Sequence, residues 1–241
     1  MFEKFPKKRV VLPEAYQKIY VEHYVKNREG QTTATGIAQK MERWMHKKVA
    51  QDVLSDSAKT TLEIGAGALN HLAYESTKVY DIVEPFTSLW ENSDSLQRIR
   101  SVYRDITEVP AENSYDRIIS IATFEHIENL PEVVAKACLM LNNSGTLRTA
   151  IPNEGTILWK LGYTLTTGIE YRLKYGLDYR ILMNYEHINT AQEIEEILHY
   201  FFNTNQRSCF GLNKSFAFYR FYESRNPNRQ RTEEYLKSIE K

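Results

Sequence analysis

The sequence predicts an α/β fold: a doubly wound, mostly parallel seven-stranded sheet with a terminal β-hairpin, an N-terminal helical extension and an insertion after the fifth strand. Three observations predict it. The length, 241 residues, suits one α/β domain with some additions. From residue 60 onward, short apolar runs alternate with segments of helix length, which is typical of βαβ units. Near the end, two strand-like segments flank Asn213-Lys214, which predicts a hairpin.

Residues 1–58 are predicted to form a helical extension or lid. Pro13 suits the first turn of a helix, and Ala15–Lys26 carries apolar and aromatic side chains on one side. A second, amphipathic helix is expected over residues 37–53, where apolar residues recur at spacings of three and four.

Residues 59–225 are predicted to form the core. Short apolar runs predict its parallel strands, with helices between them. These strands are Thr61–Ile64, Val79–Val83, Ser101–Tyr103, Arg117–Ala122 and Gly145–Ile151. Residues 156–189 lack clean periodicity and form the predicted insertion, and insertions of this kind tend to cover active sites. Thr190 and Glu193 then make a capping box for a further helix, whereas polar residues 226–241 form either a loose tail or an exposed helix.

Composition excludes several partners. Lysine plus arginine equals aspartate plus glutamate at 31 each, so no positive field attracts nucleic acid. No apolar run is long enough to insert into a membrane, and the start lacks a secretion signal, so a cytoplasmic protein is expected. The basic run Lys7-Lys8-Arg9 is interpreted as solvated surface, and Cys138 and Cys209 as buried core thiols.

The segment Glu63-Ile64-Gly65-Ala66-Gly67 follows a predicted strand directly. Two glycines there allow a sharp turn and the close approach of a ligand, which favours a nucleotide-like cofactor. A dinucleotide site needs a third glycine, and Asn70 stands in its place.

This segment resembles the first motif of the class I (Rossmann-like) S-adenosylmethionine-dependent methyltransferases, an acidic residue followed by a Gly-x-Gly turn. Glu84 ends the second strand, 19 residues after Gly65, where a carboxylate can accept both ribose hydroxyl hydrogens. Tyr103-Arg104-Asp105-Ile106 resembles the third motif of the family, and Thr123-Phe124-Glu125-His126 resembles the region after its fourth strand. The resemblance implies S-adenosylmethionine as cofactor. The cofactor-binding residues it implies are Glu63, Gly65, Ala66, Gly67, Glu84, Pro85, Asp105, Ile106 and Thr123.

Each of these assignments has a structural alternative. The glycines can form only a tight turn, the two glutamates can be solvated acids at strand ends, and Asp105 can cap a turn.

His126 is the candidate general base, because it follows the fourth strand and imidazole titrates near neutrality. The candidate acceptor-binding residues are His187, Tyr163 and Arg172 in or next to the insertion, which either face the substrate or fasten the insertion to the core. No divalent metal site is expected, since no cluster of Asp and Asn ligands can be assembled.

The function expected from this resemblance is methyl transfer to a small molecule or a glycan precursor, with O-methylation of a sugar hydroxyl in polysaccharide biosynthesis as the favoured case. Two alternatives are a nucleoside-cofactor-binding protein without turnover and an NAD(P)-dependent oxidoreductase. Asn70 and the terminal hairpin disfavour the oxidoreductase. The choice between a monomer and a homodimer is left open.

Overall fold

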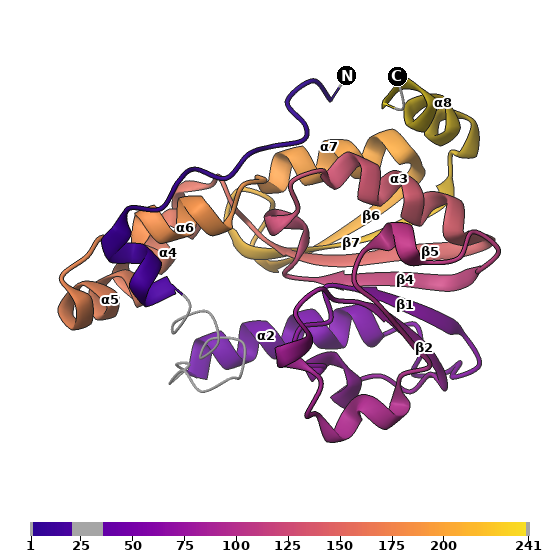
Figure 1. Ribbon diagram of the computed structural model, residues 1–241, viewed down its shortest axis with the longest axis horizontal. Coiled ribbons are helices and arrows are strands. Elements are labelled where there is room, and N and C mark those ends of the chain that lie inside the picture. Colours follow the sequence, from indigo (N-terminus) through magenta and orange to yellow (C-terminus); the bar gives the residue numbers. More distant parts are fainter. Residues whose placement is uncertain (1, 21–35, 240–241) are drawn as a thin grey trace.

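The computed structural model describes residues 2–20 and 36–239 (Figure 1). Its centre is a seven-stranded sheet in the order β3-β2-β1-β4-β5-β7-β6. The strands are β1 (Thr60–Ile64), β2 (Val79–Val83), β3 (Ser101–Tyr103), β4 (Tyr115–Ile121), β5 (Leu141–Pro152), β6 (Phe202–Gly211) and β7 (Ala217–Pro227). Strands β1 to β5 pair in parallel, and β7 is antiparallel to both of its neighbours. The predicted mostly parallel sheet with a terminal hairpin is confirmed.

Helices cover both faces of the sheet. The described chain forms the helices α2 (Gly36–Ala50), α3 (Leu130–Met140), α4 (Ile157–Leu165), α5 (Thr167–Tyr175), α6 (Tyr179–Glu186), α7 (Ala191–Phe201) and α8 (Arg229–Ile239). Helices α3, α7 and α8 lie on one face and α2 on the other (Figure 1). None of the helices in the described ranges is long and apolar enough to cross a membrane.

The N-terminal helix is described only in part. Residues 14–20 are helical, and the rest of the helix predicted at Ala15–Lys26 lies outside the described residues.

The connections between β1 and β4 differ from the expected pattern. They contain short 3₁₀ segments in place of α-helices, over Asn70–Ala73, Thr87–Leu89, Asp94–Arg98 and Ile106–Glu108. Pro85 and Pro110 interrupt two of the connections, and Asn and Ser favour turns over helix interiors. The expectation of helices between these strands is therefore wrong for this half of the sheet.

Two buried arginines anchor α2 to the sheet. Arg117 on β4 and Arg148 on β5 donate hydrogen bonds to the carbonyl of Val49, at 3.0 and 2.8 Å. Both also pair with the carboxylate of Asp52, at 3.3 and 3.1 Å. The end of α2 is thereby fixed by charge as well as by packing.

The N-terminal segment runs along the surface from α7 to the insertion (Figure 1). The Lys7 ammonium donates to the carbonyl of Ile188 and to the carboxylate of Glu193, both at 2.8 Å. Arg9 donates to the carbonyl oxygens of Tyr185 and His126, at 2.9 and 2.7 Å. The interpretation of this basic run as solvated surface is wrong for Lys7 and Arg9.

The expectation that both cysteines are buried holds only for Cys138, on α3. Cys209 is half-buried, because the hairpin that carries it lies at the edge of the sheet.

The polar C-terminal segment forms α8, which packs against α3 and α7, with the Thr232 hydroxyl 3.2 Å from the Cys138 sulfur.

Candidate functional site

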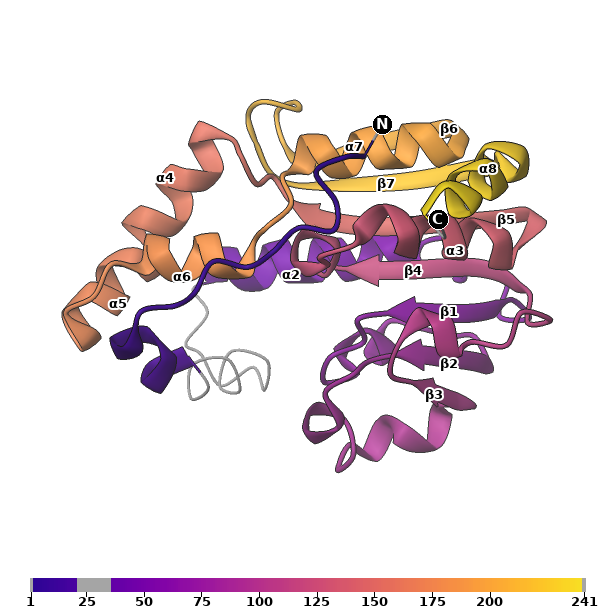
Figure 2. The same cartoon turned by 45° about the horizontal axis from the view of Figure 1, so that its top comes forward.

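The carboxyl ends of β1 and β4 point toward the side of the molecule on which α4, α5 and α6 lie (Figure 2). Since β3, β2, β1 and β4 are adjacent and parallel, residues just beyond their ends gather at one edge of the sheet. The predicted cofactor residues all follow or end these strands.

The glycine turn after β1 has the conformation that the sequence predicted. Gly65 and Gly67 have φ angles of +76° and +52°, in the left-handed region that favours glycine. A Cβ on Gly65 would lie 2.2 Å from Cγ2 of Thr123, whose hydroxyl donates to the Gly65 carbonyl at 3.3 Å. Thr123 thus packs directly over the turn, and the neighbouring Ala122 has a strained φ of +49°.

Glu84 connects β2 to the same turn. One carboxylate oxygen accepts the Gly67 backbone N–H at 2.8 Å and the other accepts the Phe86 N–H at 3.0 Å. Each carboxylate oxygen has a further lone pair, so Glu84 can accept ribose hydroxyl hydrogens while it holds the turn. The donor and acceptor set at this turn fits a nucleoside.

Glu63 is only 2% exposed, and its carboxylate accepts the Tyr80 hydroxyl at 2.7 Å. Burial raises the pKa of this carboxyl. Asp105 is exposed after β3, and one of its oxygens accepts from the backbone and hydroxyl of Thr107, at 2.8 and 2.7 Å. Ile106 packs in the core, whereas Ala66 is buried in the turn and Pro85 is exposed.

Two histidines meet beyond the glycine turn. His126 ends a short 3₁₀ segment after β4, and His187 follows α6. Their ring centroids are 4.9 Å apart with the planes at 76°. The structure therefore brings together the predicted base and a predicted acceptor residue that lies far from it in sequence.

A carboxylate lies next to the Nδ1 atom of each imidazole. Nδ1 of His126 is 2.8 Å from the Glu186 carbonyl oxygen and 3.3 Å from its carboxylate. Nδ1 of His187 is 2.8 Å from Oε2 of Glu154. Burial raises the pKa of both carboxyls, but their hydrogen bonds and charge interactions, those with the histidines first among them, together hold each pKa below its usual value. Each Nδ1 atom therefore faces oxygen acceptors, and an N–H placed there would leave Nε2 as the ring atom that can bind another group.

Glu154 and Glu186 were not predicted as site residues. Glu186 precedes His187 directly and Glu154 follows β5 by two residues, so proximity to a strand end was the available signal. Trp159 on α4 supports this arrangement, because its indole N–H donates to Glu154 at 2.6 Å and its ring stacks on His187.

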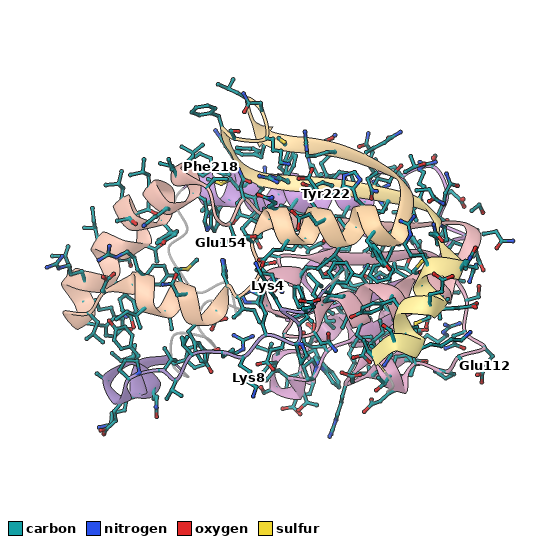
Figure 3. All side chains as sticks on the ribbon, turned by 90° about the horizontal axis from the view of Figure 1, so that it is seen from above. Lys4, Lys8, Glu112, Glu154, Phe218 and Tyr222 are labelled. Carbon is teal, nitrogen blue, oxygen red and sulfur yellow. The ribbon has the colours of Figure 1, made fainter. Side chains whose placement is uncertain are left out.

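A cavity of about 470 Å³ opens beside His187. Lys4, Lys7 and Lys8 line it together with Asn184 and Ile188. Lys4 and Lys8 are exposed, and Figure 3 shows them along the N-terminal segment, with Glu154 where the insertion joins the core.

The two other predicted acceptor residues lie apart from this cavity. Tyr163 lines a second cavity of about 290 Å³ with Lys160, Asp178 and Arg180. Arg172 is exposed on α5 and lines neither cavity.

Comparison with solved structures shows the fold of the S-adenosylmethionine-dependent methyltransferases. The N-methyltransferase NodS from Bradyrhizobium japonicum WM9, in complex with S-adenosyl-L-homocysteine, is 16% identical with a TM-score of 0.57 and covers 90% of this chain and 100% of its own. The plantazolicin methyltransferase BpumL, in complex with a pentazolic desmethylplantazolicin analogue and S-adenosylhomocysteine, is 15% identical with a TM-score of 0.58, covering 87% of this chain and 91% of its own. A methyltransferase from Thermotoga maritima is 13% identical with a TM-score of 0.53, covering 88% and 98%. No protein-family model matches the sequence, and no curated protein matches it significantly.

The contact between Gly65 and Thr123 gives a prediction of stability. Gly65→Ala should lower the free energy of unfolding by at least about 2 kcal/mol, because the methyl group adds a steric clash to an unfavourable φ. In a Thr123→Gly background the clash is absent, and the same change should cost only about 1 kcal/mol. Urea denaturation of the four proteins checks this, and equal costs in both backgrounds would show that Thr123 does not pack on the turn.

Proposed function

We propose that this protein is an S-adenosylmethionine-dependent methyltransferase that methylates a hydroxyl group of a small molecule or glycan precursor. The proposal is supported by the position of His126 next to the glycine turn. The glycine turn held by Glu84 and Thr123 lies on the same sheet edge as His126, whose backbone N–H donates to the Thr123 carbonyl at 2.9 Å.

Residues at the carboxyl ends of β1, β2 and β3 would bind the cofactor. S-Adenosylmethionine would supply a methyl group that its sulfonium already activates. Glu84 would accept the ribose hydroxyls, Gly65 and Gly67 would let the nucleoside approach the backbone, and Asp105 would face the adenine. With the donor on the edge of β1 to β3, its methyl group would face Thr123 and the loop that carries His126.

The acceptor part rests on His126 and the lysine-lined cavity. An alcohol benefits from loss of its proton as the new bond forms, and Nε2 of His126 would accept that proton, since Nδ1 faces Glu186. Lys4 and Lys8 bring positive charge to the cavity beside His187. These charges favour an anionic acceptor, and a phosphorylated sugar of a glycan precursor has both the anion and the hydroxyl.

Binding of S-adenosylhomocysteine tests the cofactor site. Wild-type protein should bind it, and Glu84→Gln should weaken binding by about 10- to 100-fold, because a charged acceptor for the ribose hydroxyls is lost. Glu91→Gln, an exposed residue on the connection after β2, is the matched control and should bind as the wild type does. Isothermal titration calorimetry measures all three, and an absence of binding by the wild type would refute the proposal.

Transfer of a labelled methyl group tests the acceptor class. Phosphorylated sugars should be methylated faster than their neutral counterparts, and Lys8→Ala should raise KM for them roughly threefold to tenfold with little change in kcat. Lys18→Ala, which removes an exposed lysine paired with Glu14, is the control. Equal rates for charged and neutral sugars would contradict the anionic assignment, and methylation on nitrogen alone would contradict the hydroxyl.

A further inference from the structure

Three side chains with metal-binding atoms converge beside the lysine-lined cavity. Glu125 and His126 follow β4, and His187 follows α6. One ligand atom from each lies within 4.8 Å of the other two. A single ion placed among them could contact all three groups.

The two imidazoles are oriented as metal ligands usually are. A metal-binding histidine donates its second N–H to a carboxylate or a backbone carbonyl, which fixes the ring and its tautomer. His187 has Glu154 at Nδ1, and His126 has the carbonyl and carboxylate of Glu186 there. With Nδ1 of each ring facing these oxygens, Nε2 is the ring atom that would contact a cation.

The buried carboxylate of Glu125 also points to a bound cation. The residue is 2% exposed, and in the part of the chain that the structure describes, its buried Oε2 atom accepts no hydrogen bond. Its other oxygen is 3.8 Å from Nε2 of His126, too far for a hydrogen bond. A buried carboxylate oxygen without a donor is costly, and a bound cation would compensate it.

We propose that Glu125, His126 and His187 bind a divalent transition-metal ion such as Zn²⁺. Two imidazoles and one carboxylate are a common donor set for such ions, and three protein ligands leave a position open for another oxygen. The sequence predicted no metal site, because only the fold brings His187 to the Glu125-His126 pair.

The catalytic role of this ion rests on the proposed function. The acceptor hydroxyl would occupy the open position, where the positive charge lowers its pKa and its proton passes to water. The resulting oxygen nucleophile would form the O–CH₃ bond as the S–CH₃ bond breaks, and the bonding pair would stay on sulfur, leaving a neutral thioether. In that case His126 would hold the ion, and the acceptor hydroxyl would lose its proton through the charge of the ion and not to Nε2 of His126 directly.

Cobalt binding tests the site without relying on activity. Full-length protein stripped with a chelator should bind Co²⁺ with a visible d–d absorption that Zn²⁺ abolishes. His187→Ala and Glu125→Gln should each weaken binding by at least about 100-fold, and Glu154→Gln by about 10- to 100-fold. His199→Ala, an exposed histidine on α7, is the control and should bind cobalt as the wild type does.

Calorimetry with S-adenosylhomocysteine on the same samples separates the two proposals. Cofactor binding without cobalt binding overturns the metal site and leaves methyl transfer standing. Cobalt binding without cofactor binding supports the metal site and refutes the proposed function. The assignment is also overturned if wild type and His187→Ala bind cobalt equally well. The same holds if His199→Ala loses as much cobalt binding as His187→Ala does.

Discussion

The buried side chain of Asn189 is the constraint on which the site depends. Its amide donates to the carbonyl oxygens of Phe124 and Ile127, at 2.8 and 2.7 Å. The backbone N–H groups of Ile188 and Asn189 both donate to the Glu125 carbonyl, at 2.9 and 3.1 Å. These bonds satisfy backbone carbonyls of the loop after β4 with donors from the end of the insertion, and they hold the two segments together.

The rest of the site follows from that connection and from the order of the strands. Asn189 places His187 beside His126, and the N-terminal segment reinforces the junction through Lys7 and Arg9. On the other side, the adjacency of β1 and β4 places Thr123 against Gly65. A short stretch of chain after β4 therefore links the glycine turn to the histidine pair and the cavity beyond it.

Local signals in the sequence predicted the strands and the glycine turn. Val79–Val83 and Ser101–Tyr103 form strands with the predicted bounds, and the capping box at Thr190 is present, since each depends on neighbouring residues. The pairing of His126 with His187 could not be predicted, because it depends on hydrogen bonds between segments about sixty residues apart. The partial burial of Lys7 likewise depends on a partner distant in sequence, Glu193. The local run of charges had predicted a solvent-exposed side chain.

A crystal structure of the complex with S-adenosylhomocysteine would show whether cofactor and acceptor meet across the loop after β4. We expect the ribose hydroxyls to contact Glu84 and the sulfur to face Thr123 and the His126–His187 pair. A nucleoside bound away from the glycine turn, or a sulfur directed away from the histidines, would contradict this expectation.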